Sequence, residues 1–115
     1  MAKLIVSLKD KTLYEVVLSK DAVTTIGRNP SNTIHFENPA VSRFHAKIYK
    51  QEWPYYIEDL GSSNGTFING SKVNWKLALK NNDRITIGKH TLVFLDQRSD
   101  YDDSKAPELD GTICV

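Results

Sequence analysis

Four short polar clusters lie between apolar runs of this 115-residue sequence. They share arginine, serine, threonine, asparagine and glycine, and they are Gly27-Arg28, Ser42-Arg43-Phe44-His45, Gly61-Ser62-Ser63-Asn64-Gly65-Thr66 and Asn69-Gly70. Guanidinium, hydroxyl, carboxamide and backbone amide groups all donate hydrogen bonds, whereas nucleophiles and bases are few. Such a set can hold an anion without transforming it. The pattern therefore predicts a module that binds phosphate.

The charged residues are divided unevenly along the chain. Residues 1–96 carry 13 Lys/Arg and 9 Asp/Glu, a balance of +4, whereas residues 97–115 carry 2 and 5, a balance of −3. A mildly basic body favours anionic ligands, but it lacks the basic stripe of a duplex-binding domain, so we expect no nucleic-acid partner. Length and composition predict one folded domain over residues 1–97 and an acidic flexible tail or linker over residues 98–115.

The cysteine and histidine content argues against disulfide and metal chemistry. Cys114 is the single cysteine, so no internal disulfide can form and no thiolate supports a zinc site. His35, His45 and His90 lack the spacing of metal ligands. The apolar run 4–6 is too short for a signal peptide or a membrane span. We therefore expect a cytoplasmic protein with no membrane partner, no metal and no cofactor.

Short apolar runs alternate with turn residues along most of the chain. This rhythm predicts strands, with no helix, at residues 4–8, 13–18, 23–26, 33–36, 44–49, 55–59, 66–68, 84–87 and 91–95. Residues 75–79 are expected to form a short strand or a loop. In the run 44–49, alternation places Phe44, Ala46 and Ile48 toward the core and His45, Lys47 and Tyr49 toward solvent. Many short strands of this kind predict an all-β sandwich or barrel.

The ordered set of motifs resembles the forkhead-associated (FHA) domain. The matching segments cover about residues 3–96, and they are Gly27-Arg28, Ser42-Arg43-Phe44-His45-Ala46, the run 59–70 and Asp83-Arg84-Ile85-Thr86-Ile87-Gly88. Each motif alone is weak, but their order along the chain is specific. The resemblance implies a sandwich of two mainly antiparallel sheets whose loops, at one end, bind phosphothreonine in an extended peptide. It also implies a monomer in Ser/Thr-kinase signalling, with a kinase or its substrate as partner.

The resemblance further implies which residues hold the phosphopeptide. Arg28 matches the main phosphate ligand of the family, and a guanidinium can donate two parallel hydrogen bonds to phosphate oxygens. Ser42 and Ser63 match positions whose hydroxyls contact phosphate, and Asn64 matches one whose amide grips the peptide backbone. Arg43 occupies a variable position, where it either adds a second positive charge or lies at the rim. An isolated arginine is usually a solvated surface residue, but the ordered motifs favour the binding role for Arg28.

A second set of residues is expected to brace the loops: Gly27, His45, Gly65, Thr66, Asn69 and Gly70. Gly61 and Gly65 are expected to adopt positive φ angles. His45 is a candidate general base because histidine titrates near neutrality. However, the sequence shows no acidic or nucleophilic residue at a spacing that would make it a catalytic partner of His45. In the resembled family, the matching histidine is architectural and hydrogen-bonds the loop that bears Asn64. We therefore expect no enzyme activity.

Other functions are compatible with parts of this pattern. The same sandwich could serve as a phosphorylation-independent interaction domain that binds its partner through a sheet face. A nucleotide-binding glycine loop needs a helix directly after it, and residues 66–70 instead have the pattern of a strand and turn, which excludes that interpretation. Thr112, with Val115 three residues later, could become a self-ligand if a kinase phosphorylated it. The alternative for this segment is an unmodified linker.

Overall fold

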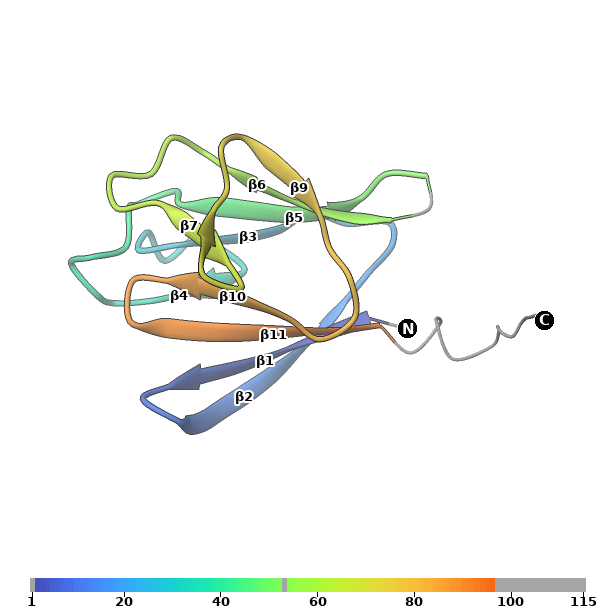
Figure 1. Cartoon of the computed structure of the whole chain (residues 1–115). Coiled ribbons are helices and arrows are strands. Elements are labelled where there is room, and N and C mark those ends of the chain that lie inside the picture. Colours follow the sequence, from blue (N-terminus) through green and yellow to red (C-terminus); the bar gives the residue numbers. More distant parts are fainter. Residues whose placement is uncertain (1, 53, 97–115) are drawn as a thin grey trace.

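The computed structural model describes residues 2–52 and 54–96, which form two β-sheets (Figure 1). Sheet A contains, in spatial order, β2 (Lys11–Leu18), β1 (Ala2–Leu8), β11 (His90–Asp96), β10 (Asp83–Ile87), β7 (Thr66–Ile68) and β8 (Ser71–Lys72). Sheet B contains β4 (Ile34–His35), β3 (Thr24–Gly27), β5 (Ala46–Lys50), β6 (Tyr55–Asp59) and β9 (Lys76–Ala78). The predicted all-β sandwich of two mainly antiparallel sheets is confirmed. In the part of the chain that the structure describes, no helix is long and apolar enough to cross a membrane.

Strand pairing follows from short turns that reverse the chain. All paired strands are antiparallel except β3 and β4, which pair in parallel. The β1–β2 turn consists of Lys9 and Asp10, whose φ angles are 52° and 66°. A two-residue turn with both φ angles positive matches the twist of the flanking strands. The Asn69-Gly70 turn between β7 and β8 has the same character, with φ angles of 51° and 89°.

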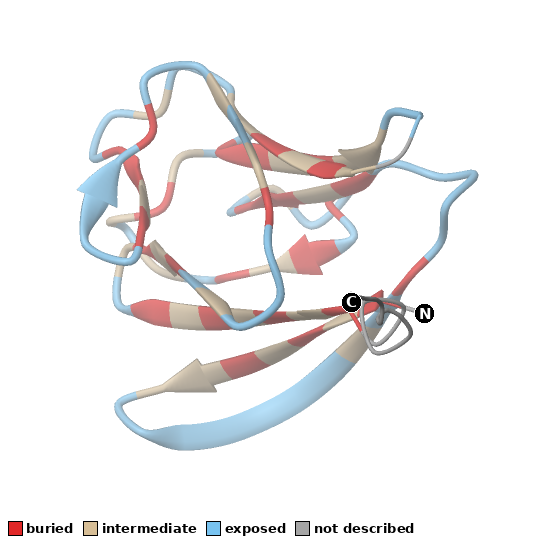
Figure 2. Cartoon of the chain, turned by 45° about the vertical axis from the view of Figure 1, so that its right-hand side comes forward, coloured by how far each residue is buried: buried red, intermediate tan, exposed pale blue. Residues whose placement is uncertain are grey.

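The core lies between the sheets and is formed by alternating side chains of both. Leu92 and Phe94 in sheet A, and Ile48 and Ile57 in sheet B, are at most 1% exposed. The rings of Phe94 and Tyr55 meet across the layers with their centroids 5.6 Å apart. Figure 2 shows this alternation as red and tan bands along β11, whereas most of the edge strand β2 is exposed. Burial on one face of each strand is what the period-2 pattern predicts.

The alternation predicted for residues 44–49 is wrong at its start. Ala46 and Ile48 are buried as expected, but Phe44 is 49% exposed and His45 is fully buried. The reason is that β5 begins only at Ala46, and the two preceding residues belong to the β4–β5 loop. A loop backbone is not pleated, so the period of two does not extend into it. His45 therefore lies inside the molecule rather than on its surface.

Two short edge strands complete the sheets. The segment 75–79 contains β9, in agreement with the expected short strand or loop. The strand β8 was not predicted, since Ser71 and Lys72 are both exposed and no apolar residue marks them as a strand. Its existence depends on the preceding turn, which folds it back onto β7.

Three loops lie together at one end of the sandwich. They are the β3–β4 loop (residues 28–33), the β4–β5 loop (residues 36–45) and the β6–β7 loop (residues 60–65). Figure 1 shows them at the end opposite the beginning of β1 and the end of β11. Three of the four polar clusters of the sequence fall in or beside these loops. The fold thus gathers at one end groups that are up to 36 positions apart, from residue 28 to residue 64.

We predict that Phe94→Ala lowers the free energy of unfolding by about 3–5 kcal/mol, because it leaves a cavity between the sheets. Val17→Ala on the edge strand, where Val17 is 63% exposed, is the control and should change stability by less than about 0.5 kcal/mol. Urea denaturation followed by tryptophan fluorescence measures both. Equal effects of the two substitutions would contradict the assigned core.

Candidate functional site

A surface pocket of about 250 Å³ lies among the three loops. Its lining residues are Arg28, Pro39, Ala40, Val41, Ser42, Arg43, Ser63 and Asn64. The set includes every residue that the sequence predicted to touch a phosphopeptide. The pocket therefore combines two guanidinium groups, two hydroxyls and one carboxamide within a single small volume.

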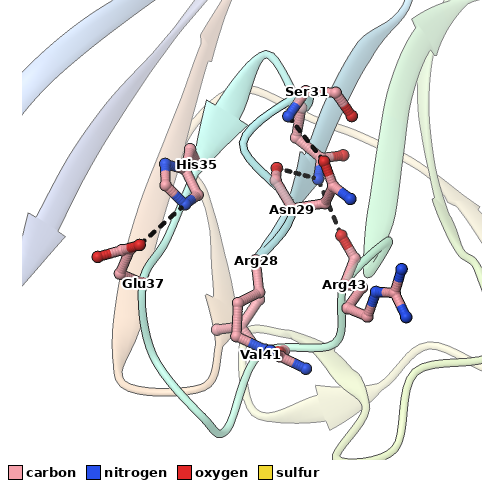
Figure 3. A network of polar contacts seen from close by, with 8 residues as sticks. Arg28, Asn29, Ser31, His35, Glu37, Val41 and Arg43 are labelled. Carbon is pink, nitrogen blue, oxygen red and sulfur yellow. Dashed lines mark hydrogen bonds and ion pairs between the residues drawn. The ribbon is translucent and has the colours of Figure 1, made fainter.

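Arg28 is held in place among these loops by hydrogen bonds of its own backbone and side chain. It directly follows β3, and its amide donates to the Ser42 carbonyl at 3.0 Å. Its Nε donates to the Val41 carbonyl at 3.0 Å, which orients the guanidinium plane (Figure 3). Within residues 2–52 and 54–96, the terminal guanidinium nitrogens have no hydrogen-bond partner. Two donors on a side chain that is already oriented suit a planar, bidentate contact with an oxyanion.

Gly27 permits the close approach of the β3–β4 and β4–β5 loops. A Cβ at this position would lie 2.7 Å from Asn32 Nδ2 and 2.9 Å from the carbonyl carbon of Arg43, so no other residue fits without displacing backbone. Asn32 joins the same loops, since its Nδ2 donates to the carbonyls of Asn29 at 2.8 Å and Arg43 at 2.9 Å. Sequence reasoning missed Asn32, although its place in the turn Asn29-Pro30-Ser31-Asn32 was a signal.

Ser42 and Asn64 connect the β4–β5 loop to the β6–β7 loop. The Ser63 amide donates to Ser42 Oγ at 3.0 Å, which leaves the Ser42 hydroxyl proton able to donate to a ligand. Asn64 Nδ2 donates to the Ala40 carbonyl at 2.9 Å, which positions the side-chain oxygen and the second amide proton at the pocket. Both bonds span more than 20 residues of sequence. The same groups thus form the pocket and hold its walls together.

His45 bridges these loops from beneath. The Ser42 amide donates to His45 Nδ1 at 3.0 Å, so Nδ1 carries no proton in this arrangement. Nε2 is then the protonated ring nitrogen and donates to the Gly65 carbonyl at 2.9 Å. The ring is fully buried, and among residues 2–52 and 54–96 no carboxylate pairs with it. Both ring nitrogens are therefore engaged with loop backbone, which is a structural arrangement and not that of a general base.

Asp59 organises the β6–β7 loop, and sequence reasoning did not find it. Its Oδ1 accepts the hydroxyls of Ser62 at 2.6 Å and Thr66 at 2.7 Å, and its Oδ2 accepts the amides of Gly61 and Ser62, both at 3.1 Å. Burial alone would raise the pKa of Asp59, but the hydrogen bonds from Ser62, Thr66 and Gly61 outweigh it and hold the pKa below its ordinary value. The signal was an aspartate two residues before a glycine, which is typical of a side-chain-closed turn.

The other residues expected to brace the loops occupy two different places. Thr66 is fully buried, and Gly65, with a φ angle of 89°, lies beside it in the β6–β7 loop. Asn69 and Gly70 form the β7–β8 turn and do not line the pocket. Asn69 instead ties that turn to β10, through bonds to Asp83 and to the Arg84 amide, both at 3.0 Å.

The β4–β5 loop also rests on sheet A. The rings of Phe36 and His90 stack with their centroids 3.8 Å apart. A Cβ on Gly88, whose φ angle is 61°, would lie 3.0 Å from Val41 Cγ2, so the β10–β11 turn touches the loop directly. Burial lowers the pKa of His90. His90 thus packs against the first residue of the β4–β5 loop, a contact that its position in the sequence did not indicate.

The described residues offer no metal site. Among residues 2–52 and 54–96, no three His, Cys, Asp or Glu side chains are arranged to hold a metal ion. The donors that line the pocket are nitrogens and hydroxyls, which suit an anion.

The model of the FHA domain family matches residues 24–88, more than half of the chain. The chain belongs to the FHA domain family. The match begins at β3 and ends after β10, so it contains all three loops of the pocket.

Several proteins are similar to this FHA domain. The glycogen accumulation regulator GarA of Mycobacterium tuberculosis is 38% identical over 78 residues, which are 68% of this chain and 48% of that protein. The FHA domain of CT664 from Chlamydia trachomatis superposes with a TM-score of 0.75 at 28% identity, over 83% of this chain and 96% of that one. EmbR of Mycobacterium tuberculosis, in complex with a low-affinity phosphopeptide, gives a TM-score of 0.71 at 32% identity, over 82% of this chain and 24% of that one.

The matched region is only a part of each of these curated relatives. The chain spans about half the length of the curated relatives it matches. Neither the matched family nor GarA is named as an enzyme, and GarA is named as a regulator.

We predict that Asp59→Asn makes the stability of this FHA domain less dependent on pH in acid. Because the folded pKa of Asp59 lies below its unfolded value, its contribution is complete above about pH 4 and is lost as pH falls through the folded pKa. The wild type should therefore lose more stability than the variant between about pH 5 and pH 2. Urea denaturation at a series of pH values measures the difference. Parallel curves for the two proteins would contradict the assigned role.

We also predict that His45→Ala destabilises the domain by about 2–4 kcal/mol, because it removes a buried ring and leaves the Ser42 amide and the Gly65 carbonyl without partners. Thermal unfolding measures the effect. His35→Ala is the control, because the His35 side chain is 32% exposed and spans no two loops. An unchanged melting temperature for His45→Ala would show that the bridge does not stabilise the loops.

Proposed function

We propose that the three loops bind phosphothreonine within an extended peptide and that the domain is a non-enzymatic reader in Ser/Thr-kinase signalling. The observation that carries this proposal is the pocket shared by Arg28, Arg43, Ser42, Ser63 and Asn64. It offers positive charge and several hydrogen-bond donors, and its lining contains no carboxylate. A phosphate dianion is the common biological group that such a set satisfies best.

Each residue has a distinct role in this proposal. Arg28 donates two bonds to the phosphate from a guanidinium that Val41 already orients. The hydroxyls of Ser42 and Ser63 donate one bond each to phosphate oxygens. Asn64 binds the peptide backbone beside the phosphothreonine, because its carboxamide can both donate and accept. Arg43, exposed on the loop, adds a second positive charge.

The comparisons support this ligand class. The structure of EmbR contains a phosphopeptide on a chain that is 32% identical to this one over the aligned region. We further propose that the partner is a phosphothreonine protein, either a Ser/Thr kinase or its substrate. Neither nucleic acid nor membrane is part of the proposal, and the domain acts as a cytoplasmic monomer.

The domain limits form part of the same proposal. Residues 1–97 are the binding domain, and residues 98–115 are an acidic tail or linker with a balance of −3 between residues 97 and 115. The tail and Thr112, which the sequence suggested as a self-ligand, lie outside the described residues.

Binding through this pocket should be of modest strength. Each charge-assisted hydrogen bond contributes about 1.5–3 kcal/mol, but the phosphate and the guanidinium must lose their hydration. We expect dissociation constants on the order of micromolar for short peptides. The threonine methyl group adds about 0.8 kcal/mol if it is buried, which corresponds to about fourfold selectivity over phosphoserine.

We predict that Arg28→Ala abolishes phosphopeptide binding and leaves the melting temperature within a few degrees of the wild type. The reason is that Arg28 is exposed and contributes two pocket donors but no core packing. The measurement is calorimetric titration with an oriented phosphothreonine peptide library and then with its best individual sequences. Arg84→Ala is the matched control, since Arg84 is an exposed arginine on β10 and does not line the pocket.

The unphosphorylated and phosphoserine forms of the same peptides complete the experiment. The proposal requires no measurable binding of the first and weaker binding of the second. Equal affinity for phosphorylated and unphosphorylated peptides would instead support a phosphorylation-independent interaction domain. Unchanged affinity in Arg28→Ala would remove the pocket as the binding site.

A further inference from the structure

A second pocket, of about 540 Å³, adjoins the first and shares Arg28 and Pro39 with it. Its remaining lining residues are Glu37 and Asn38 from the β4–β5 loop. The two pockets differ in charge. Both contain Arg28, but the first adds Arg43 and no carboxylate, whereas the second adds the carboxylate of Glu37, so their formal charges are +2 and 0. A ligand that spans both therefore meets two guanidinium groups in the first pocket and a carboxylate in the second.

The Glu37 carboxylate is available to a ligand. Its side chain is 83% exposed, and its neighbour in the structure is His35 Nε2 at 3.8 Å. Figure 3 shows this carboxylate turned toward His35, whereas the Arg28 guanidinium lies toward Val41. Arg28 and Glu37 thus line the same pocket without forming an ion pair among the described residues. Glu37 does not neutralise the arginine on which phosphate binding depends.

The segment 38–41, whose residues line the two pockets, is fixed by local hydrogen bonds. Asn38 Oδ1 accepts the Ala40 amide at 2.9 Å, and the Asn38 carbonyl accepts the Val41 amide at 2.9 Å. The Asn38 amide donates to the Phe36 carbonyl at 3.0 Å, which closes the turn just after Glu37. Pro39 further restricts the backbone. Since the segment 36–41 is held in this way, the backbone position from which the Glu37 side chain extends is largely set before a ligand binds.

We infer that the second pocket is a subsite for a lysine or arginine side chain of the bound peptide, placed within three residues of the phosphothreonine. The inference rests on the proposed function, because it takes the phosphate to lie at Arg28. An extended peptide advances about 3.3 Å per residue, so a side chain two or three positions away lies about 7–10 Å along the peptide. Because Arg28 and Glu37 line the same pocket, the long and flexible side chain of a lysine or arginine at such a position can reach the Glu37 carboxylate. The domain thus selects phosphothreonine sites with a basic flanking residue.

The lining of the second pocket also determines which charge it favours on the flanking side chain of the peptide. Once the phosphate engages Arg28, Glu37 is the remaining charged group that lines the second pocket, so it repels a glutamate or aspartate there and attracts a cation. Because Glu37 is exposed, the pair is a surface ion pair, and its effect on affinity is modest. The preference should also weaken at high ionic strength, since the screening length falls to about 3 Å at 1 M salt.

The test uses peptides with one phosphothreonine and alanine elsewhere, in which a single flanking position, from three before to three after, is lysine or glutamate. At one or more positions the lysine peptide should bind the wild-type chain about three- to tenfold more tightly than the glutamate peptide. Glu37→Gln should remove this preference, and Glu37→Lys should reverse it. Glu52→Lys is the matched control, because it changes the net charge equally on an exposed glutamate at the β5–β6 turn and should retain the preference.

The outcomes separate the subsite from the proposed function. Phosphate-dependent binding without a lysine preference would overturn the subsite alone. The same loss of preference in Glu37→Lys and Glu52→Lys would assign it to net charge and likewise overturn the subsite. If no phosphopeptide binds the wild type at any position, the proposed function fails and the subsite fails with it.

Discussion

The structure of the pocket depends on the bridge that His45 forms between two loops. One ring nitrogen accepts the Ser42 amide and the other donates to the Gly65 carbonyl, and the ring itself is fully buried. The β4–β5 loop is anchored by the buried Phe36 and Val41, but the β6–β7 loop offers only the exposed Leu60, so hydrogen bonds must fix its place beside the other loop. Because unmade bonds at a buried position are costly, the bridge strongly favours one relative placement of the loops. The placement of Ser42, Ser63 and Asn64 around Arg28 follows from it.

A carboxylate close in sequence to an anion-binding residue is at first unexpected. Asp59 is four positions before Ser63, and its negative charge would repel a phosphate if it were directed at the pocket. In the structure it instead accepts four hydrogen bonds, three from Gly61 and Ser62 in the following loop and one from Thr66 at the start of β7. Those bonds disperse its charge and hold its pKa below the ordinary value, so it remains ionised as a turn-forming group. Glu37 is the opposite case, since it is exposed and turned away from the guanidinium of Arg28, and its charge remains available to act on a ligand.

Much of the fold could be predicted because its strands obey a simple rule. Runs such as 55–59 and 91–95 are short, rich in β-branched, aromatic and other apolar residues and bounded by turn residues, which is typical of strands, and burial alternates along the resulting β6 and β11. The rule gave the wrong burial for Phe44 and His45 because both lie in a loop. Side chains alternate between two faces only where the backbone is a pleated strand. It also missed β8, whose two exposed residues are placed by the turn before them. Asp59 and Asn32 were missed for a related reason, as their roles consist of hydrogen bonds to backbone groups that a sequence does not locate.

The sequence by itself determined the all-β class, the family and the residue types able to hold an anion, because these depend on periodicity and on local chemistry. It also identified Arg28, Ser42, Arg43, Ser63 and Asn64 as candidates. Only the tertiary structure decided that these five line one pocket, that His45 is buried beneath the loops, and that Glu37 lines an adjoining pocket together with Arg28. The physical reason is that bonds such as Asn64 to Ala40 join residues 24 positions apart. Their geometry arises from the packing of two sheets and three loops together, which no local pattern contains.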